Sequence, residues 1–69
     1  MVTIRVKRNI WGNWNAYEGS SRVAELGESE WLAVDWTSER LARGACRLSD
    51  LSDITQAQVD AHRARLASI

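Results

Sequence analysis

Residues 9–19, NIWGNWNAYEG, place two tryptophans and a tyrosine around a Gly-Asn pair. The preceding residues 2–7, VTIRVK, alternate β-branched apolar residues with polar ones, a pattern typical of a half-buried strand. Gly12-Asn13 suits a two-residue hairpin turn, because glycine at the first central position accepts a positive φ without a steric clash. The sequence therefore predicts a β-hairpin centred on these two residues.

That turn fixes an expected register. Trp11 would face Trp14, and Lys7 would face Glu18, giving one aromatic pair and one opposite-charge pair. One face of the hairpin and of the strand that follows would carry Trp11, Trp14, Ala16, Ala24 and Leu26. The other face would carry Val2, Ile4, Val6, Ile10, Tyr17 and Val23.

The whole chain is expected to form one α+β domain, in which a three-stranded antiparallel sheet packs against two helices. After the turn at Gly19-Ser20-Ser21, residues 22–26 read as a third strand, completing a meander. A small sheet covered by helices on one face is the usual layered solution. The expected segments are a β-meander at 1–27, a helix at 28–44, a short strand or loop at 45–53 and a helix at 55–68.

Local signals mark the ends of both helices. Ser29 suits the N-cap of the first helix, and Gly44 suits the residue just after its end. Thr55 and Gln58 form the pattern of a capping box at the start of the second helix. Ile54 and Val59 flank that box at the positions of a hydrophobic staple, and Val59, His62, Leu66 and Ile69 follow along one stripe of the helix.

The four tryptophans are divided between core and surface. Trp31 is expected in the core and Trp36 at its margin. A single layer of helices covers only one face of a sheet, so Trp11 and Trp14 are expected to form an exposed patch of the kind found at partner surfaces. The alternative is that a bulge near Gly12 turns these rings inward, or that Trp14 covers an edge of the core.

Net charge is zero, but the charges are segregated along the chain. Residues 1–17 carry +3, residues 18–39 carry −5 and residues 40–69 carry +2. One interpretation is mutual neutralisation on a solvated surface. The other is that the acidic middle forms a face of one sign that seeks a basic partner. Its members are Glu18, Glu25, Glu28, Glu30, Asp35 and Glu39.

Catalytic and metal motifs are absent from the sequence, and no cofactor is expected. One cysteine, Cys46, and one histidine, His62, do not complete a closed zinc site. Their pairing as nucleophile and base is an alternative hypothesis. Asp50, Asp53 and Asp60 flank a helix start, where carboxylates complement the helix dipole. The unpaired cysteine and the charged amino-terminal segment favour a cytoplasmic location, with no signal peptide and no membrane span.

The segment KRNIWGNWNAYEGSSRVAEL, residues 7–26, and the acidic helix after it resemble small proteins of phages and other mobile elements, a setting that includes the anti-CRISPR proteins. The resemblance covers roughly the first forty residues and carries no known active site. It implies a protein that binds an effector of a bacterial host, in some cases by resembling nucleic acid electrostatically.

Three hypotheses follow. The first is a non-enzymatic inhibitor that uses the acidic residues with Trp11 and Trp14 to block a basic nucleic-acid-binding groove of a host protein or ribonucleoprotein complex. The second is a single-strand nucleic-acid-binding module that uses Arg5, Lys7, Trp11 and Trp14. The third is a structural homodimer that hides the Trp11–Trp14 patch. The chain is expected to be a monomer or a homodimer.

Overall fold

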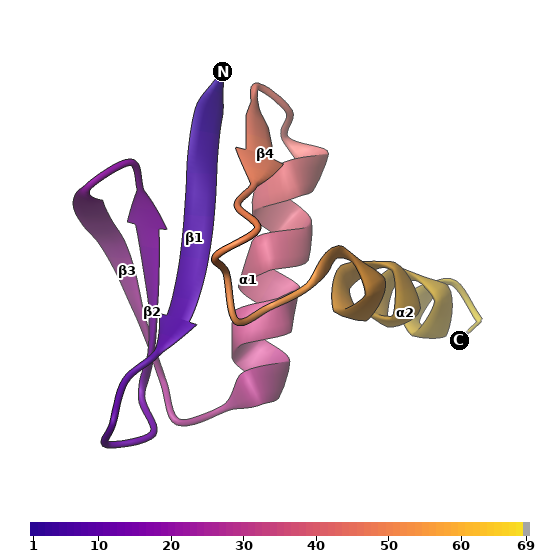
Figure 1. Ribbon diagram of the computed structural model, residues 1–69. Coiled ribbons are helices and arrows are strands. Elements are labelled where there is room, and N and C mark those ends of the chain that lie inside the picture. The colour runs from indigo at the N-terminus through magenta and orange to yellow at the C-terminus, as the bar shows by residue number, and fades with distance from the viewer. Residues whose placement is uncertain (69) are drawn as a thin grey trace.

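A computed structural model describes residues 1–68 as an α+β fold with a four-stranded sheet and two helices. The strands are β1 (Val2–Arg8), β2 (Trp14–Glu18), β3 (Ser21–Gly27) and β4 (Cys46–Leu48). The helices are α1 (Glu30–Ala42) and α2 (Gln56–Ala67). The sheet order is β3-β2-β1-β4 (Figure 1).

The sheet differs from the predicted meander by its fourth strand. β3, β2 and β1 pair antiparallel as predicted, but β4 lies parallel to β1, with Thr3 opposite Arg47. The sheet is therefore mixed, and the segment left open as strand or loop supplies its short edge strand. Beyond β4 a loop continues along β1, where the Ser52 hydroxyl accepts from the Val6 N–H and donates to the Val6 carbonyl.

The predicted two-residue hairpin turn at Gly12-Asn13 is wrong, because the loop is one residue longer. The loop has three residues, Ile10 to Gly12, and is closed by the bond from the Asn9 N–H to the Asn13 carbonyl, 2.9 Å. Gly12 has a φ of 84°, as expected for the last residue of a three-residue hairpin loop. The Asn9 side chain stabilises this form, because its Oδ1 accepts from the N–H groups of both Trp11 and Asn13.

The longer loop changes the register by an odd number of residues, which exchanges the faces of β2 relative to β1. Arg8 lies opposite Trp14, and Lys7 lies opposite Asn15 rather than Glu18. Trp14 therefore shares the inner face with Ile4 and Val6, while Tyr17 joins the outer face. The predicted separation of Trp14 from the aliphatic residues of β1 is wrong.

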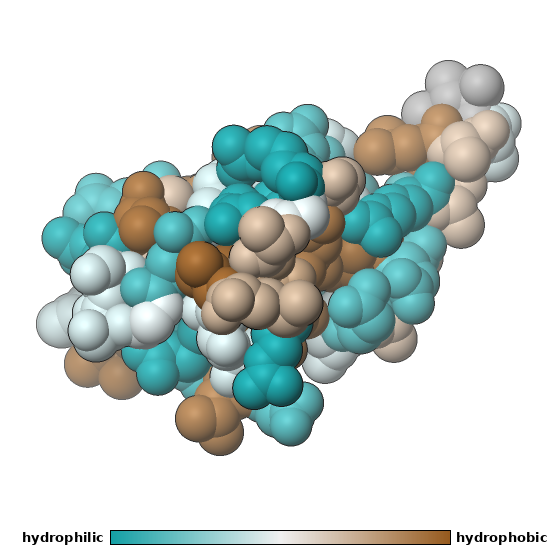
Figure 2. Space-filling model, turned by 90° about the horizontal axis from the view of Figure 1, so that it is seen from above, coloured by the Kyte–Doolittle hydropathy of each residue, from teal (hydrophilic) through white to brown (hydrophobic). Residues whose placement is uncertain are grey.

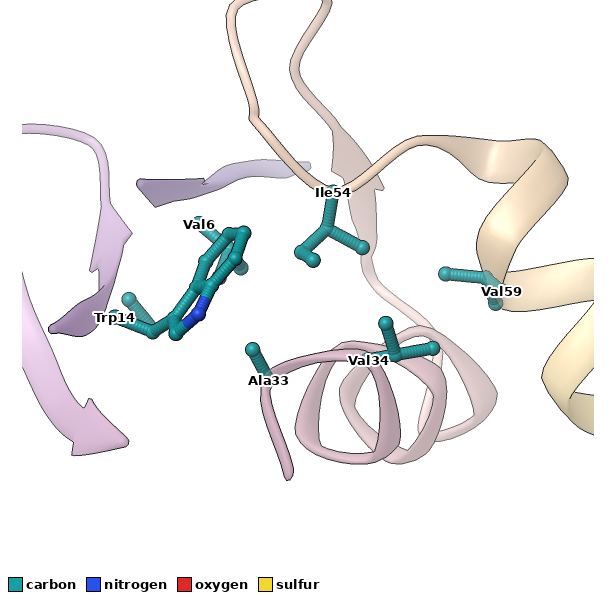
Figure 3. Packing of buried hydrophobic residues seen from close by; sticks show 7 residues of the cluster. Val6, Trp14, Ala33, Val34, Ile54 and Val59 are labelled. Atoms are coloured by element: carbon teal, nitrogen blue, oxygen red, sulfur yellow. The ribbon is translucent and has the colours of Figure 1, made fainter. Parts of the chain in front are cut away.

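The core lies between the sheet and α1, closed at one end by the start of α2. Figure 3 shows Val6 and Trp14 pointing from the sheet toward Ala33 of α1 and Ile54. Ile4, Val6, Ala16, Ala33, Ile54 and Val59 are fully buried, and Trp14 is 6% exposed. Figure 1 shows α1 running beside the sheet and α2 extending away, so that α2 packs chiefly on α1.

The predicted helix ends are confirmed. Ser29 caps α1 through a bond from the Leu32 N–H, and Gly44 follows that helix with a φ of 79°. Thr55 and Gln58 form the capping box of α2, and Ile54 and Val59 beside it are both buried. The core assignment of Trp31 is wrong, because this side chain is 54% exposed. On the predicted stripe of α2, Val59 and His62 are buried, whereas Leu66 is 47% exposed. Trp36 lies at the core margin as predicted, and Ile69 lies outside the described residues.

Candidate functional site

Three of the six acidic residues singled out in the sequence line one groove. Glu25 of β3 and Asp35 and Glu39 of α1 border a cavity of about 280 Å³ between the strand and the helix. Its other lining residues are apolar: Leu26, Leu32 and Trp36. We call these six residues the β3–α1 groove.

The groove follows one stripe of α1. Residues 32, 35, 36 and 39 recur at helical spacing, so their side chains leave the helix on the same side. Leu26 and Trp36 are partly buried and pack against the hydrophobic core, which fixes the apolar side of the groove. Leu32 is 50% exposed and completes the apolar surface.

The carboxylates of the groove differ in their hydrogen bonding. Asp35 Oδ1 lies 2.9 Å from Nε2 of His62, a ring that is buried and meets Trp31 edge-on. Glu25 forms a 3.1 Å ion pair with Arg22, in which both side chains are exposed. Among residues 1–68, no cation lies within ion-pair distance of Glu39. The groove therefore has carboxylate oxygens available to a partner.

The remaining acidic residues lie apart from the groove. Glu18 forms a 2.8 Å ion pair with Arg40, and this hydrogen bond raises the pKa of the guanidinium. Glu30 accepts a 2.9 Å bond from Gln58 of α2, whereas Glu28 is exposed in the turn before α1. The predicted acidic face is thus only partly gathered: Glu25, Asp35 and Glu39 share one groove, and Glu18 serves to join β2 to α1.

The two hairpin tryptophans do not form a common patch. Trp14 is buried, while Trp11 is 76% exposed at the loop tip beside Ile10, which is 90% exposed. The loop and the turn from β3 into α1 lie at the same end of the molecule (Figure 1). Glu25 connects them, since it also lines a second cavity of about 470 Å³ with Asn9, Asn13, Asn15, Trp14, Arg22 and Gly27.

Arg5 and Lys7 both lie on the face of the sheet opposite the core, as their alternation with buried Ile4 and Val6 requires. The guanidinium of Arg5 lies 5.0 Å from the ring centroid of Tyr17. Lys7 is already engaged, because its Nζ donates to Asp53 and to the Leu51 carbonyl. The rings predicted to accompany these cations are elsewhere, Trp14 in the core and Trp11 in the loop.

Within residues 1–68, the side chains considered for catalysis do not come together in one site. Cys46 contacts Arg40, whereas His62 contacts Asp35 and Trp31, so the two are not hydrogen-bonded as a nucleophile and base. Asp53 accepts from the Arg8 N–H and from Lys7, contacts that lower its pKa. Over residues 1–68 no three potential metal ligands cluster together.

Neither helix in the described part of the chain has the length and apolar character needed to cross a membrane. Figure 2 shows hydrophilic and hydrophobic residues interleaved over the end of the molecule where β1 begins, with α2 extending from the body. In comparisons with known proteins, no protein family, no curated protein and no solved structure matches the chain.

Proposed function

We propose that this protein is a non-enzymatic binding module whose β3–α1 groove takes a basic segment of a partner protein. One observation carries the proposal: three carboxylates border three apolar side chains in a single groove of about 280 Å³. Lysine and arginine combine an apolar stem with a cationic head, and this groove offers a matching surface to each part.

The contacts available in the groove favour a cationic side chain over an apolar one. A stem lying along Leu32 reaches the Trp36 indole, which attracts a cation through its ring face. The carboxylate of Glu39 then meets the head group as a charge-assisted hydrogen-bond acceptor. An entirely apolar side chain would desolvate these carboxylates without pairing them, which costs free energy.

The hairpin loop supplies a second contact at the same end of the molecule. Trp11 and Ile10 protrude from a loop whose conformation is already fixed by the Asn9 side chain. A loop backbone held in place before binding loses little conformational freedom in a complex, and tryptophan is enriched among the residues that dominate binding energy. Trp11 would therefore anchor the partner beside the groove.

The partner we propose is a nucleic-acid-processing host complex whose basic groove ordinarily contacts phosphates. The protein would inhibit it as anti-CRISPR proteins inhibit their targets, with the carboxylates of Glu25, Asp35 and Glu39 occupying positions otherwise taken by phosphate. Glu28 and Glu30, outside the groove, are exposed before and at the start of α1 and would add long-range attraction for a basic partner. Long-range attraction between surfaces of opposite sign would speed association.

The test compares two charge reversals with the same change in net charge. Glu39→Lys alters the groove, and Asp50→Lys alters an exposed carboxylate in the loop after β4. Immobilised wild type and variants are incubated with bacterial lysate, and captured proteins are identified by mass spectrometry. We expect a nucleic-acid-binding protein that is captured by wild type and Asp50→Lys, is lost with Glu39→Lys and is displaced by added nucleic acid.

Affinity for that partner is then measured at several salt concentrations. Reversing Glu25, Glu28 and Glu30 together should weaken binding several-fold and flatten its salt dependence, because fewer charges are neutralised in the complex. Trp11→Ala should weaken binding by tenfold or more if the ring is an anchor, since about 1.4 kcal/mol corresponds to tenfold. Equal capture by all variants, or affinity that is insensitive to the triple reversal, would reject the proposal.

A further inference from the structure

The face of the sheet turned away from α1 carries a row of cations around one aromatic ring. In the observed register Arg5 lies opposite Tyr17, and Tyr17 lies opposite Arg22, so one ring stands between two arginines on three adjacent strands. Thr3 and Arg47 form the neighbouring pair on β1 and β4. We call Arg5, Tyr17, Arg22 and Arg47 the open-face cluster.

Arg5 is the central member, and its charge is not compensated. Its guanidinium carbon lies 5.0 Å from the Tyr17 ring centroid, and its buried Nε has no hydrogen-bond partner. Within residues 1–68 no carboxylate lies within ion-pair distance of it. A cation held against a ring without an acid is a site that an anion stabilises.

The other two arginines are available to the same ligand. Within residues 1–68, the one hydrogen bond of the Arg47 guanidinium runs from its Nε to the hydroxyl of Thr3, at 3.4 Å. Arg22 pairs with Glu25, but both side chains are exposed, and exposed ion pairs contribute little free energy. An anion can therefore replace Glu25 as the partner of Arg22 at small cost. Lys7, in contrast, is held by Asp53 at the edge of the face.

We propose that the open-face cluster binds single-stranded nucleic acid. Phosphates would contact the guanidiniums of Arg5, Arg22 and Arg47, and a base would stack on or beside Tyr17, the combination of cations and rings that single strands require. An acidic peptide would satisfy the charges but has no planar bases to stack. This face is opposite the core from α1, and of the groove residues only Glu25 touches the cluster, through its ion pair with Arg22. The variants at Arg5 and Tyr17 therefore test the cluster without altering the groove.

The experiment is fluorescence anisotropy with a labelled oligo-dT of about 12 nucleotides, within the range of lengths that single-strand modules cover. A duplex of equal length and an oligo-glutamate peptide serve as competitors. We expect the unlabelled single strand to compete at least tenfold more strongly than either. Tyr17→Leu should weaken binding at least about fivefold, as expected for loss of one stacked base, and Tyr17→Phe should retain the wild-type affinity.

Separate controls test the role of charge in binding and the folding of each variant. Arg5→Gln should reduce the slope of log K against log salt by about 0.7, the loss of one phosphate contact on a single strand, while Arg65→Gln on α2 should leave the slope unchanged. Circular dichroism identifies any variant that fails to fold, and the competition of single strand, duplex and oligo-glutamate for the wild-type protein still tests the proposal in that case. Absence of binding, equal losses from Arg5→Gln and Arg65→Gln, or stronger competition by oligo-glutamate would overturn the proposal.

Discussion

The two faces of the β-sheet are built from alternate residues of the same strands, yet one face is buried in the core and the other carries charged side chains. On β1, Ile4 and Val6 are fully buried under α1, whereas Arg5 and Lys7 are turned outward. On β2, Trp14 and Ala16 belong to the core, and Tyr17 faces outward beneath Arg5. The inner face determines stability, and the outer face is left free to carry charge.

The difference shows which residues a small domain can assign to binding. A chain of this size buries only about 60% of the surface exposed by its unfolded form, so every inner position is needed for the core. Outer positions and the rim of the β3–α1 groove lie outside that constraint, except for Asp35, which contacts the buried His62. Substitutions should therefore divide into two classes: inner ones that change the free energy of unfolding strongly, and outer ones that change it little and act chiefly on binding.

The largest contrast is expected between the two hairpin tryptophans. Trp14→Ala should lower the free energy of unfolding by about 3–5 kcal/mol, because it leaves a large cavity between β2 and α1. Trp11→Ala should change it by less than about 0.5 kcal/mol, since that ring is exposed in the loop. Urea unfolding followed by far-ultraviolet circular dichroism measures both, and Trp14→Phe provides a milder variant if Trp14→Ala does not fold. Equal destabilisation by the two alanine variants would contradict the assignment of faces.

The next contrast lies between consecutive residues of β1. Ile4→Ala should cost about 2–5 kcal/mol through its buried position. Arg5→Ala should cost no more than about 1 kcal/mol, the scale of an exposed cation–π contact. The same urea titration checks both values. A larger effect at Arg5 than at Ile4 would show that the outer face also determines stability, and the division proposed here would fail.

The sequence predicts the features that depend on neighbouring residues. The capping box of Thr55 and Gln58, the N-cap Ser29 and the positive φ of Gly44 are all confirmed, because each is set within one turn of a helix. The first strand is predicted for the same reason, from alternation alone. These signals give the order of the main elements and the α+β class.

Register and long-range pairing are predicted less well. The Gly12-Asn13 pair fits a two-residue turn equally well by composition, but the Asn9 side chain stabilises a three-residue loop instead. That difference of one loop residue places Trp14 in the core and Tyr17 outside it. The pairing of β4 with β1 joins residues more than forty positions apart through three residues, too few for periodicity to indicate.

The sequence predicts that the candidate site combines carboxylates with an aromatic ring, but it does not predict which residues form the site. The acidic middle of the chain does supply the groove carboxylates Glu25, Asp35 and Glu39, but the aromatic ring beside them is Trp36. One signal for this exists, since Leu32, Asp35, Trp36 and Glu39 share a helical stripe. The sequence does not show that Glu25 and Leu26 of β3 border this stripe, because that contact depends on how the sheet meets α1.

A smaller effect is expected from two carboxylate contacts, the hydrogen bond of Asp35 with His62 and the ion pair of Glu25 with Arg22. Asp35→Ala should lower the free energy of unfolding by about 1–3 kcal/mol, because a carboxylate only accepts, and its loss leaves the buried His62 N–H without an acceptor. Glu25→Ala, which breaks the exposed pair with Arg22, should cost less than about 0.5 kcal/mol. Urea unfolding at neutral pH measures both. Equal losses of unfolding free energy would mean that the buried position of His62 does not strengthen its contact with Asp35.

The smallest effect is expected at the edge of the open face, where Asp53 joins the loop after β4 to β1. Hydrogen bonds from the Arg8 N–H and Lys7 hold the pKa of this carboxyl below its unfolded value, so the ionised form stabilises the folded protein. That stability is present above about pH 4, the unfolded value, and is lost as the pH falls through the lower folded value. Asp53→Asn should therefore lower the free energy of unfolding by less than about 1 kcal/mol at neutral pH. The difference between wild type and variant should narrow at about pH 3. If urea unfolding shows the same difference between wild type and Asp53→Asn at both pH values, the ionised carboxylate adds nothing to stability beyond what the amide provides.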